Sequence, residues 1–265
     1  MLLTKVISSY KGKGIKFTFE KIKNKLFRSK IKNYKNYQEL LSGKNGIEIG
    51  GLSNYFTKHG LLPIYHVINS IDGVNFSNET IWEGKLEKGQ NYKFTKNKIG
   101  YQYICDAVDL SAIYSSKYDF TLSCNSLEHI ANPLKAITEW LRVLKPDGVI
   151  VLVIPRKESN FDHNRATTTF NHLKADHERD TKEDDLSHVD EILKLHDLSL
   201  DTPAGNLEQF KARSLDNHNN RCLHQHVFDM KVLKEIFNYF NIEELQSNST
   251  NTDYIIAGRK KHKVE

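Results

Sequence analysis

The chain has 265 residues, of which 27% are charged, and its formal net charge is +5. This length suits one α/β domain with additions, or two small domains. No apolar run approaches the roughly 20 residues of a membrane-spanning helix, and the first residues lack the apolar core of a secretory signal. Three scattered cysteines (Cys105, Cys124 and Cys222) provide neither a disulfide framework nor a CxxC zinc motif. We therefore expect a globular cytoplasmic protein.

The positive charge belongs to the N-terminal arm. Residues 1–36 contain eleven Lys and Arg and a single acid, Glu20, so their local charge is +10 and the other residues sum to −5. Apolar residues at helical spacing predict a helix over 18–42, within a basic helical arm over 1–43. Two interpretations stay open: peripheral contact with an anionic surface such as a membrane, or a solvated helix that packs on the body.

Four short apolar segments predict the first strands. They cover residues 46–50, His66–Ile71, Tyr101–Cys105 and Tyr118–Ser123. The first ends in the sequence IEIGG. A pair of glycines weakens regular structure, because glycine loses more backbone freedom on folding than any other residue. The pair therefore indicates a sharp turn, or a place where the backbone comes close to a ligand.

The clearest local signal is the sequence NPLKAITEWLRVLKPDG. Asn132 can cap a helix, and Pro133 suits its first position. Leu134, Ile137, Leu141 and Leu144 recur at helical spacing, and Pro146–Asp147–Gly148 is expected to end the helix. The following VIVLVIP is typical of a central strand that is buried on both faces. Strands that alternate with helices predict an α/β fold with a parallel sheet.

The next part of the chain is different. Residues 155–225 are polar and rich in Asp and His, and eight of the twelve histidines fall between His163 and His226. We interpret about 157–225 as a helical insertion over the sheet that forms the acceptor side of a site. A helix over Asp229–Phe240 and strands in IEELQS and DYIIAGRK are expected to close the sheet edge.

Two stretches resemble the class I S-adenosylmethionine (SAM) methyltransferases. IEIGG resembles their first motif, and YDFTLSCNSLEHIANPLKAITEWLRVLKPDGVIVLVIP is similar to their segment from the fourth to the fifth strand. The resemblance covers roughly residues 44–156 and the closing strands. It implies a Rossmann-like, seven-stranded, mostly parallel sheet, a methyltransferase domain over 44–265, and SAM as cofactor. The GxGxxG of nicotinamide enzymes and the phosphate loop are both absent.

The same resemblance implies the cofactor residues. Gly50 and Gly51 correspond to the turn under the methionine part of SAM, and Glu48 to the acid that fixes this turn and the ammonium group. The remaining expected contacts are Asp72 for the ribose, Asp106 with Ala107 for the adenine, and Asn125 for the methionine end.

A second resemblance concerns a metal. NSLEHI and HQHVFDMKVLKEIF resemble segments of methyltransferases that modify the 2′-hydroxyl of small RNA ends, where they hold a divalent ion. This implies Glu128, His129 and His226 as ligands of Mn²⁺ or Mg²⁺, with Asn125 in place of a first glutamate. Such an ion lowers the pKa of a bound hydroxyl. The alternative is that Glu128 and His129 are ordinary turn residues of a metal-independent enzyme.

A general base is expected just after the fifth strand. FDHNR places His163 at the carboxyl end of the sheet, and His188 is the second candidate.

Residues 44–258 also resemble a group of bacterial methyltransferases found among capsule and O-antigen enzymes. This implies a sugar O-methyltransferase that acts on a nucleotide-activated heptose or hexose, with no nucleic-acid partner and a homodimer as the expected assembly. Three alternatives remain: an RNA methyltransferase that uses the basic arm, a methyltransferase of catechol-like or quinone-like small molecules, and a SAM-fold binding module without catalysis.

Overall fold

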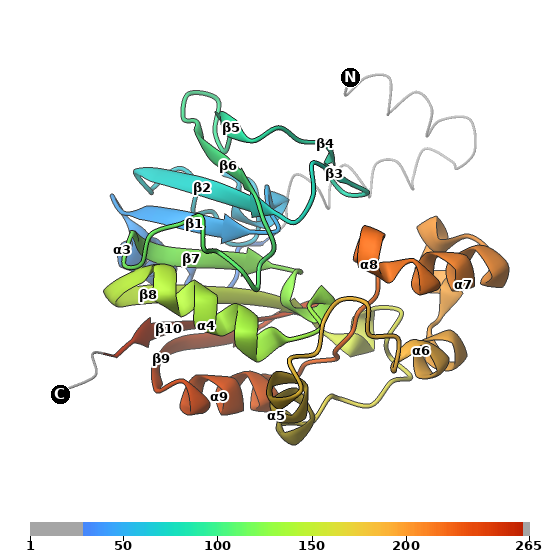
Figure 1. Cartoon of the computed structure of the whole chain (residues 1–265). Helices are drawn as coiled ribbons and strands as arrows, with labels where there is room; N and C mark the ends of the chain where they lie inside the picture. The colour runs from blue at the N-terminus through green and yellow to red at the C-terminus, as the bar shows by residue number, and fades with distance from the viewer. Residues whose placement is uncertain (1–28, 262–265) are drawn as a thin grey trace.

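The computed structural model describes residues 29–261 (Figure 1). It contains an α/β domain whose central sheet carries helices on its faces, and a group of short helices beyond one end of the strands. The expected basic arm lies mostly outside the described residues. Of the helix predicted over 18–42, the described part contains α3 (Tyr34–Leu41).

The central sheet has eight strands in the order β5-β6-β2-β1-β7-β8-β10-β9. Strands β6, β2, β1, β7 and β8 are parallel, whereas β10 runs antiparallel to β8 and β9, and β5 runs antiparallel to β6. The mostly parallel Rossmann-like sheet is therefore confirmed, with edge strand β5 in addition to the seven strands expected. The strands are β1 (Asn45–Ile49), β2 (Ser70–Asn75), β5 (Gly89–Tyr92), β6 (Gly100–Ile104), β7 (Tyr118–Cys124), β8 (Leu144–Pro155), β9 (Ile242–Ser249) and β10 (Asp253–Lys260), with a separate hairpin of β3 (Glu79–Thr80) and β4 (Gly84–Lys85).

Helices α4 and α9 cover one face of the sheet (Figure 1). Helix α4 begins as expected, since the Asn132 side chain accepts a hydrogen bond from the backbone N of Lys135 and Pro133 takes the first position. It ends at Val143, directly before β8, so Pro146–Asp147–Gly148, expected to end the helix, lies inside the strand. After α3, the helices are α4 (Pro133–Val143), α5 (Phe170–Glu178), α6 (Val189–Leu195), α7 (Leu207–Leu215), α8 (Asn217–Asn220) and α9 (Met230–Tyr239). Short 3-10 turns cover Asn54–Phe56, Leu127–His129, Lys157–Ser159, Leu198–Leu200 and Thr202–Ala204.

Strand β8 carries the centre of the core. Its side chains alternate between two apolar clusters, one on each face of the sheet: Ile150 and Leu152 pack with α4 and α9, whereas Val149 and Val151 pack on the other face. All are almost fully buried. This confirms the sequence interpretation of a strand covered on both sides.

The second strand differs from its prediction. It was expected over His66–Ile71, but β2 begins at Ser70 and ends at Asn75. Its sequence SIDGVN contains poor strand formers, so pairing with β1 and β6 determines its position against local propensity. Consequently Asp72 lies inside β2, and Asn75 is the residue at its carboxyl end.

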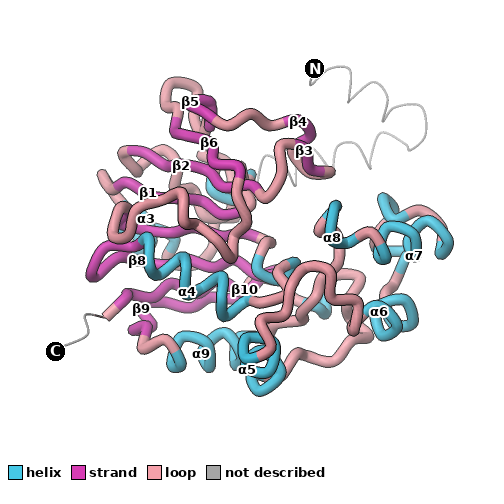
Figure 2. The backbone as a smooth tube through the Cα atoms, viewed as in Figure 1, coloured by secondary structure: helices cyan, strands magenta, loops and turns pink. Residues whose placement is uncertain are grey.

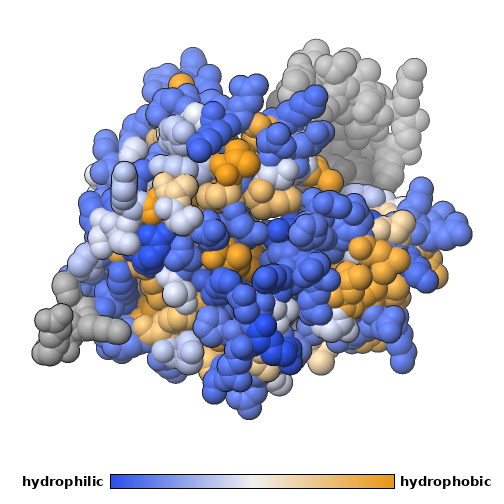
Figure 3. All heavy atoms as spheres, viewed as in Figure 1, coloured by the Kyte–Doolittle hydropathy of each residue, from blue (hydrophilic) through white to orange (hydrophobic). Residues whose placement is uncertain are grey.

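The segment between β8 and α9 carries α5 to α8. Helices α6 to α8 lie beyond the carboxyl ends of the parallel strands, whereas α5 lies beside α9 (Figure 2). Five buried apolar side chains form a separate small cluster here: Val189, Ile192, Ala204, Phe210 and Leu223. The face shown in Figure 3 is largely hydrophilic, with apolar atoms gathered in small patches. No helix within residues 29–261 has both the length and the apolar character that crossing a membrane requires.

Candidate active site

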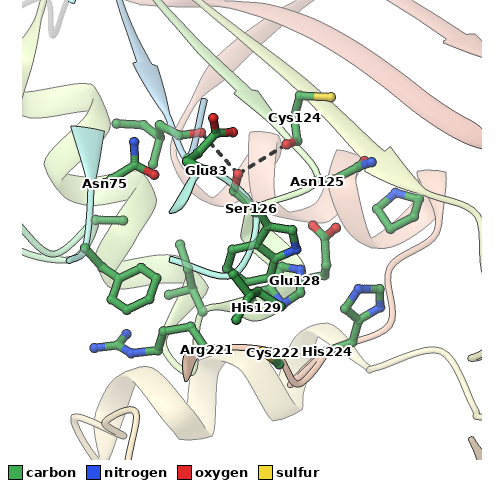
Figure 4. Close-up of a pocket in the computed structure, with 18 of the residues that line it drawn as sticks. Asn75, Glu83, Cys124, Asn125, Ser126, Glu128, His129, Arg221, Cys222 and His224 are labelled. Atoms are coloured by element: carbon green, nitrogen blue, oxygen red, sulfur yellow. Dashed lines mark hydrogen bonds between the residues drawn. The ribbon is translucent and has the colours of Figure 1, made fainter. Parts of the chain in front are cut away.

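A cavity of about 630 Å³ opens at the carboxyl ends of β1, β2 and β7 (Figure 4). Its walls come from three parts of the chain. The sheet edge contributes Gly50, Asn75, Asp106, Ala107, Asn125, Glu128 and His129, whereas the segment after β8 contributes Asn160, Phe161, Asp201, Arg213, Arg221, Cys222 and His224. Ile81, Trp82 and Glu83 line a third side.

The turn after β1 requires both of its glycines. Gly50 has a φ of +72°, and a Cβ there would lie 2.2 Å from Ser126 Oγ. A Cβ on Gly51 would lie 2.3 Å from Glu48 Cδ. Gly50 therefore has the left-handed conformation that glycine adopts without steric cost. At Gly51 the Glu48 side chain leaves no room for a Cβ. Of the two, Gly50 lines the cavity, and Gly51 packs against Glu48 behind it.

Glu48 supports this turn from the side that faces away from the cavity. The carboxylate is fully buried and accepts hydrogen bonds from Ser53 N (3.1 Å), Tyr65 OH (2.7 Å) and Tyr92 OH (2.7 Å). Burial raises the pKa of Glu48 to about 7, although the three hydrogen bonds oppose that shift. Neither Glu48 nor Gly51 lines the cavity, so both shape the turn from outside it.

Asp106 and Ala107 line the cavity beyond β6, as predicted from their position after the strand. Asp106 Oδ1 accepts a hydrogen bond from Val108 N (3.1 Å), and Oδ2 accepts one from Arg221 (2.9 Å). Arg221 also forms an ion pair with buried Glu183 (3.1 Å). An arginine of the segment after β8 therefore connects that segment to the cavity edge.

The expected position of Asp72 is wrong. Its Oδ2 accepts hydrogen bonds from Tyr118 OH (2.6 Å) and Lys117 Nζ (3.3 Å), at the amino end of β7 and therefore opposite the cavity. Asn75 lines the cavity instead and donates to the Gly51 carbonyl (2.9 Å). The sequence analysis missed Asn75 because it ended the strand four residues too early.

Glu128, His129 and His224 converge at the other end of the cavity, and one ligand atom from each lies within 4.8 Å of the others. Glu128 is 1% exposed, and neither carboxylate oxygen has a hydrogen-bond partner. Burial raises the pKa of Glu128 to about 7. His129 Nδ1 donates to the Leu223 carbonyl (3.0 Å), while burial and then the charge of His224 lower its pKa to about 3.

His224 is held by a buried aspartate. A hydrogen bond joins its Nδ1 to Asp162 Oδ2, and Asp162 Oδ1 accepts a second bond from buried Arg165 (2.9 Å). Burial alone raises the pKa of Asp162, but His224 and Arg165 outweigh it and lower this pKa to about 2. Burial likewise disfavours the charged form of His224, but the bond to Asp162 raises its pKa. The sequence analysis missed this pair, although FDHNR contains Asp162.

Three histidines predicted for this site lie elsewhere. His226 is grouped with His172, Asp176 and His188, so the expected set of Glu128, His129 and His226 does not form. The HQH motif contains two histidines, and the sequence does not show which of them faces the cavity. His163 is partly exposed and donates to Asp197 Oδ2 (2.9 Å) outside the cavity. Neither candidate base, His163 or His188, lines the cavity.

Residues 49–152 match the family described as "Methyltransferase domain". Residues 49–152 of this chain therefore form a methyltransferase domain. The match covers the glycine turn, Asp106 and the residues Glu128 and His129, but it ends before the segment that holds His224. The match therefore includes the sheet side of the cavity, whereas the side formed by the segment after β8 lies outside it.

A comparison with curated proteins gives no match. Among solved structures, the chain is similar to a SAM-dependent methyltransferase from Aquifex aeolicus, with 12% identity, 89% of this chain and 92% of that chain covered, and a TM-score of 0.45. The N-methyltransferase NodS from Bradyrhizobium japonicum shares 11% identity, with 86% and 94% covered and a TM-score of 0.45. A SAM-dependent methyltransferase from Methanosarcina mazei shares 14%, with 88% and 99% covered and a TM-score of 0.45.

Proposed function

We propose that this protein transfers the methyl group of SAM to a sugar hydroxyl, with a nucleotide-activated heptose or hexose of surface polysaccharide synthesis as the acceptor. One observation carries the proposal: Glu128 presents two buried, unpartnered carboxylate oxygens beside His129 and His224 in the cavity. Buried carboxylates are costly without partners. A hydroxyl-bearing acceptor supplies such partners at the place where the methyl group must arrive.

SAM occupies the sheet side of the cavity in this proposal. Its methionine part lies over Gly50 and near Asn125, and its adenine lies at Asp106 and Ala107. Asn75 takes the role that was expected of Asp72. Its amide nitrogen already donates to the Gly51 carbonyl, so its amide oxygen accepts a hydrogen bond from a ribose hydroxyl.

The acceptor side has the composition that a sugar requires. Asn160, Asp201 and Arg213 supply polar groups, and the rings of Trp82 and Phe161 supply flat apolar surface. Sugars present both hydroxyl groups and apolar ring faces, so a mixed lining of this kind suits them. The resemblance of residues 44–258 to enzymes of capsule and O-antigen synthesis supports the same substrate class.

A divalent cation fits the group formed by Glu128, His129 and His224, because a carboxylate and two imidazoles are ligands that Mn²⁺ accepts. A bound cation lowers the pKa of a hydroxyl that it contacts. In this arrangement Asp162 fixes the ring orientation of His224 by its hydrogen bond. Glu128 and His129 define where the acceptor oxygen lies relative to the methyl donor, so alignment supplies most of the remaining catalysis.

The test is a mass-spectrometric assay of the full chain with SAM and a panel of nucleotide-activated sugars. We expect one sugar to gain a methyl group, EDTA to abolish turnover, and Mn²⁺ or Mg²⁺ to restore it. Glu128→Gln should lower turnover by roughly 100-fold or more with SAM affinity retained. The matched control is Glu158→Gln, an exposed carboxylate outside the cavity. Methylation of RNA or a catechol but no sugar would refute the substrate class, and turnover insensitive to EDTA would refute the role of the metal.

A further inference from the structure

A second cluster of ligand-type side chains lies outside the cavity. It consists of His172 and Asp176 on α5, His188 directly before α6, and His226 in the segment before α9. One ligand atom from each residue lies within 4.8 Å of all the others. None of the four lines the cavity. Three separate parts of the chain therefore bring nitrogen and oxygen ligands to one point.

The spacing of these atoms is that of ligands around a single ion. His172 Nε2 lies 3.1 Å from His188 Nε2 and 3.1 Å from Asp176 Oδ2. The ring of His226 lies beside the same oxygen, with its Nε2 3.9 Å away. Around tetrahedral zinc, with bonds of about 2.0–2.1 Å, neighbouring ligand atoms lie roughly 3.3 Å apart. His172 Nε2 is already close to that separation from both His188 Nε2 and Asp176 Oδ2.

Two members of the cluster are buried and lack partners. Asp176 and His226 are each 1% exposed. Asp176 Oδ2 and His226 Nδ1 have no hydrogen-bond partner. Asp176 Oδ2 lies 3.1 Å from His172 Nε2, and without a proton on that nitrogen the buried carboxylate oxygen lacks a hydrogen bond, which is costly. A cation among these groups removes that cost.

Neighbouring groups hold the ligand side chains in position. Asp176 Oδ1 accepts hydrogen bonds from Arg179 (2.7 Å) and Thr181 (3.3 Å), which leaves Oδ2 directed at the histidines. The spacing of His172 and Asp176 by four residues places them on the same face of α5. His226 Nε2 donates to the Ala131 carbonyl (3.2 Å), so the unpartnered Nδ1 is the nitrogen of this ring that is free to bind a metal. Metal ligands are typically oriented by such contacts.

We propose that His172, Asp176, His188 and His226 form a structural zinc site. Three imidazoles and one carboxylate give four protein ligands and no open position, as in structural zinc sites, whereas catalytic zinc keeps one position for water or substrate. Magnesium and calcium prefer sites made wholly of oxygen ligands. This site is separate from the cation group of Glu128, His129 and His224 in the cavity, and it does not depend on the proposed sugar acceptor.

The zinc site fastens the segment after β8 to the methyltransferase domain. That segment has a separate apolar cluster of only five buried side chains, so apolar burial contributes little to holding α6 and α7. His226 N donates to the Glu128 carbonyl (3.2 Å), which connects the zinc ligands to the acceptor end of the cavity. Binding of zinc to these three segments therefore stabilises the wall that carries His224.

The experiment measures metal content in the purified full-length protein after dialysis into metal-free buffer, by mass spectrometry of the elements. We expect about one zinc per chain, and an intense visible absorption of tetrahedral Co²⁺ after exchange with cobalt. Asp176→Asn and His188→Ala should lose the metal. The matched controls are His177→Ala, on the same helix next to Asp176, and Glu128→Gln in the cavity; both should retain it.

Circular dichroism and SAM binding establish that each variant is folded. A wild-type protein that binds no zinc even after addition of the metal would overturn the proposal, and this result needs no variant. Retention of zinc by Asp176→Asn, or its loss in Glu128→Gln with retention in His188→Ala, would place the ion elsewhere and would also contradict it. Neither result changes the expected methyl transfer, so failure of this proposal is distinguishable from failure of the proposed function.

Discussion

The two sides of the cavity are built in different ways. On the sheet side, backbone turns at the ends of buried strands set the geometry, and the main requirements are the absence of a Cβ at Gly50 and Gly51. On the opposite side, the geometry depends on side-chain hydrogen bonds and ion pairs, such as Asp162 with His224 and Arg221 with Asp106. The sheet side is fixed by the core, whereas the other side is fixed by polar contacts.

This difference predicts different sensitivities. Small changes of backbone shape should damage the sheet side, because its core is packed on both faces of β8 and has little room to adjust. On the other side, loss of one polar partner should matter more than a change of volume, because a buried partner is then left unpaired.

Gly50→Ala is expected to have the largest effect on the sheet side. The new Cβ would meet Ser126 Oγ at 2.2 Å and would occupy a left-handed position. Overpacking of this kind costs about 1–3 kcal/mol, so SAM affinity should fall by roughly 10- to 100-fold in calorimetry. Gly84→Ala is the matched control: its φ is +71° and nothing lies within 4 Å of the new Cβ. Equal loss of affinity in both variants would contradict the importance of the contact with Ser126.

Asp162→Asn tests the other side. In the wild type, the charge of Asp162 orients His224 and raises the pKa of that histidine. The variant removes this charge and keeps the size of the side chain. Loss of such a supporting contact typically costs about 10- to 100-fold in activity or metal affinity, so turnover should fall by that factor while SAM affinity is unchanged. Asp197→Asn, which removes the partner of partly exposed His163, should leave turnover as it is. A parallel loss of SAM affinity in Asp162→Asn would show that the two sides are not separable.

Glu48→Gln examines the support of the glycine turn through pH. Burial raises the pKa of Glu48 to about 7 from an ordinary value of 4.5. The folded state therefore binds more protons than the unfolded state between these values, and the free energy of unfolding falls as pH rises from about 4.5 to 7. The variant should lack this pH-dependent part of the free energy of unfolding, which is on the order of 2–3 kcal/mol. Chemical denaturation at pH 5 and pH 8 measures it, and an unchanged difference between wild type and variant at the two values would contradict a buried, titrating Glu48.

His163→Ala should have the smallest effect. His163 was predicted as a base, but it lies outside the cavity and pairs with Asp197. We expect turnover to change by less than about twofold, since removing a surface ion pair has little energetic consequence. A large loss of turnover in a normally folded variant would contradict this expectation and would show that His163 takes part in catalysis.

The sheet side could be predicted from the sequence largely because its signals are local. The glycine pair, the Asn-Pro start of α4 and the apolar run of β8 each determine a short piece of structure. The exception is β2: its residues include Asp72, Gly73 and Asn75, which disfavour strands, so pairing with its neighbours decides its position. Because the predicted strand ended four residues too early, Asp72 was expected in the site where the structure has Asn75.

The other side could be predicted only in composition. The richness in His and Asp indicated a polar site, but the sequence gives no distances between residues far apart in the chain. His224 and His226 are separated by one residue, yet one joins Glu128 and His129 whereas the other joins His172, Asp176 and His188. That division depends on how α5 and α6 pack, which no short motif encodes.

The most direct test of the central claim is a crystal structure of the protein with S-adenosylhomocysteine. We expect adenine at Asp106 and Ala107, ribose at Asn75, and the sulfur atom facing Glu128, His129 and His224. A ligand bound elsewhere, or one bound in the cavity with its sulfur turned away from these three residues, would contradict it.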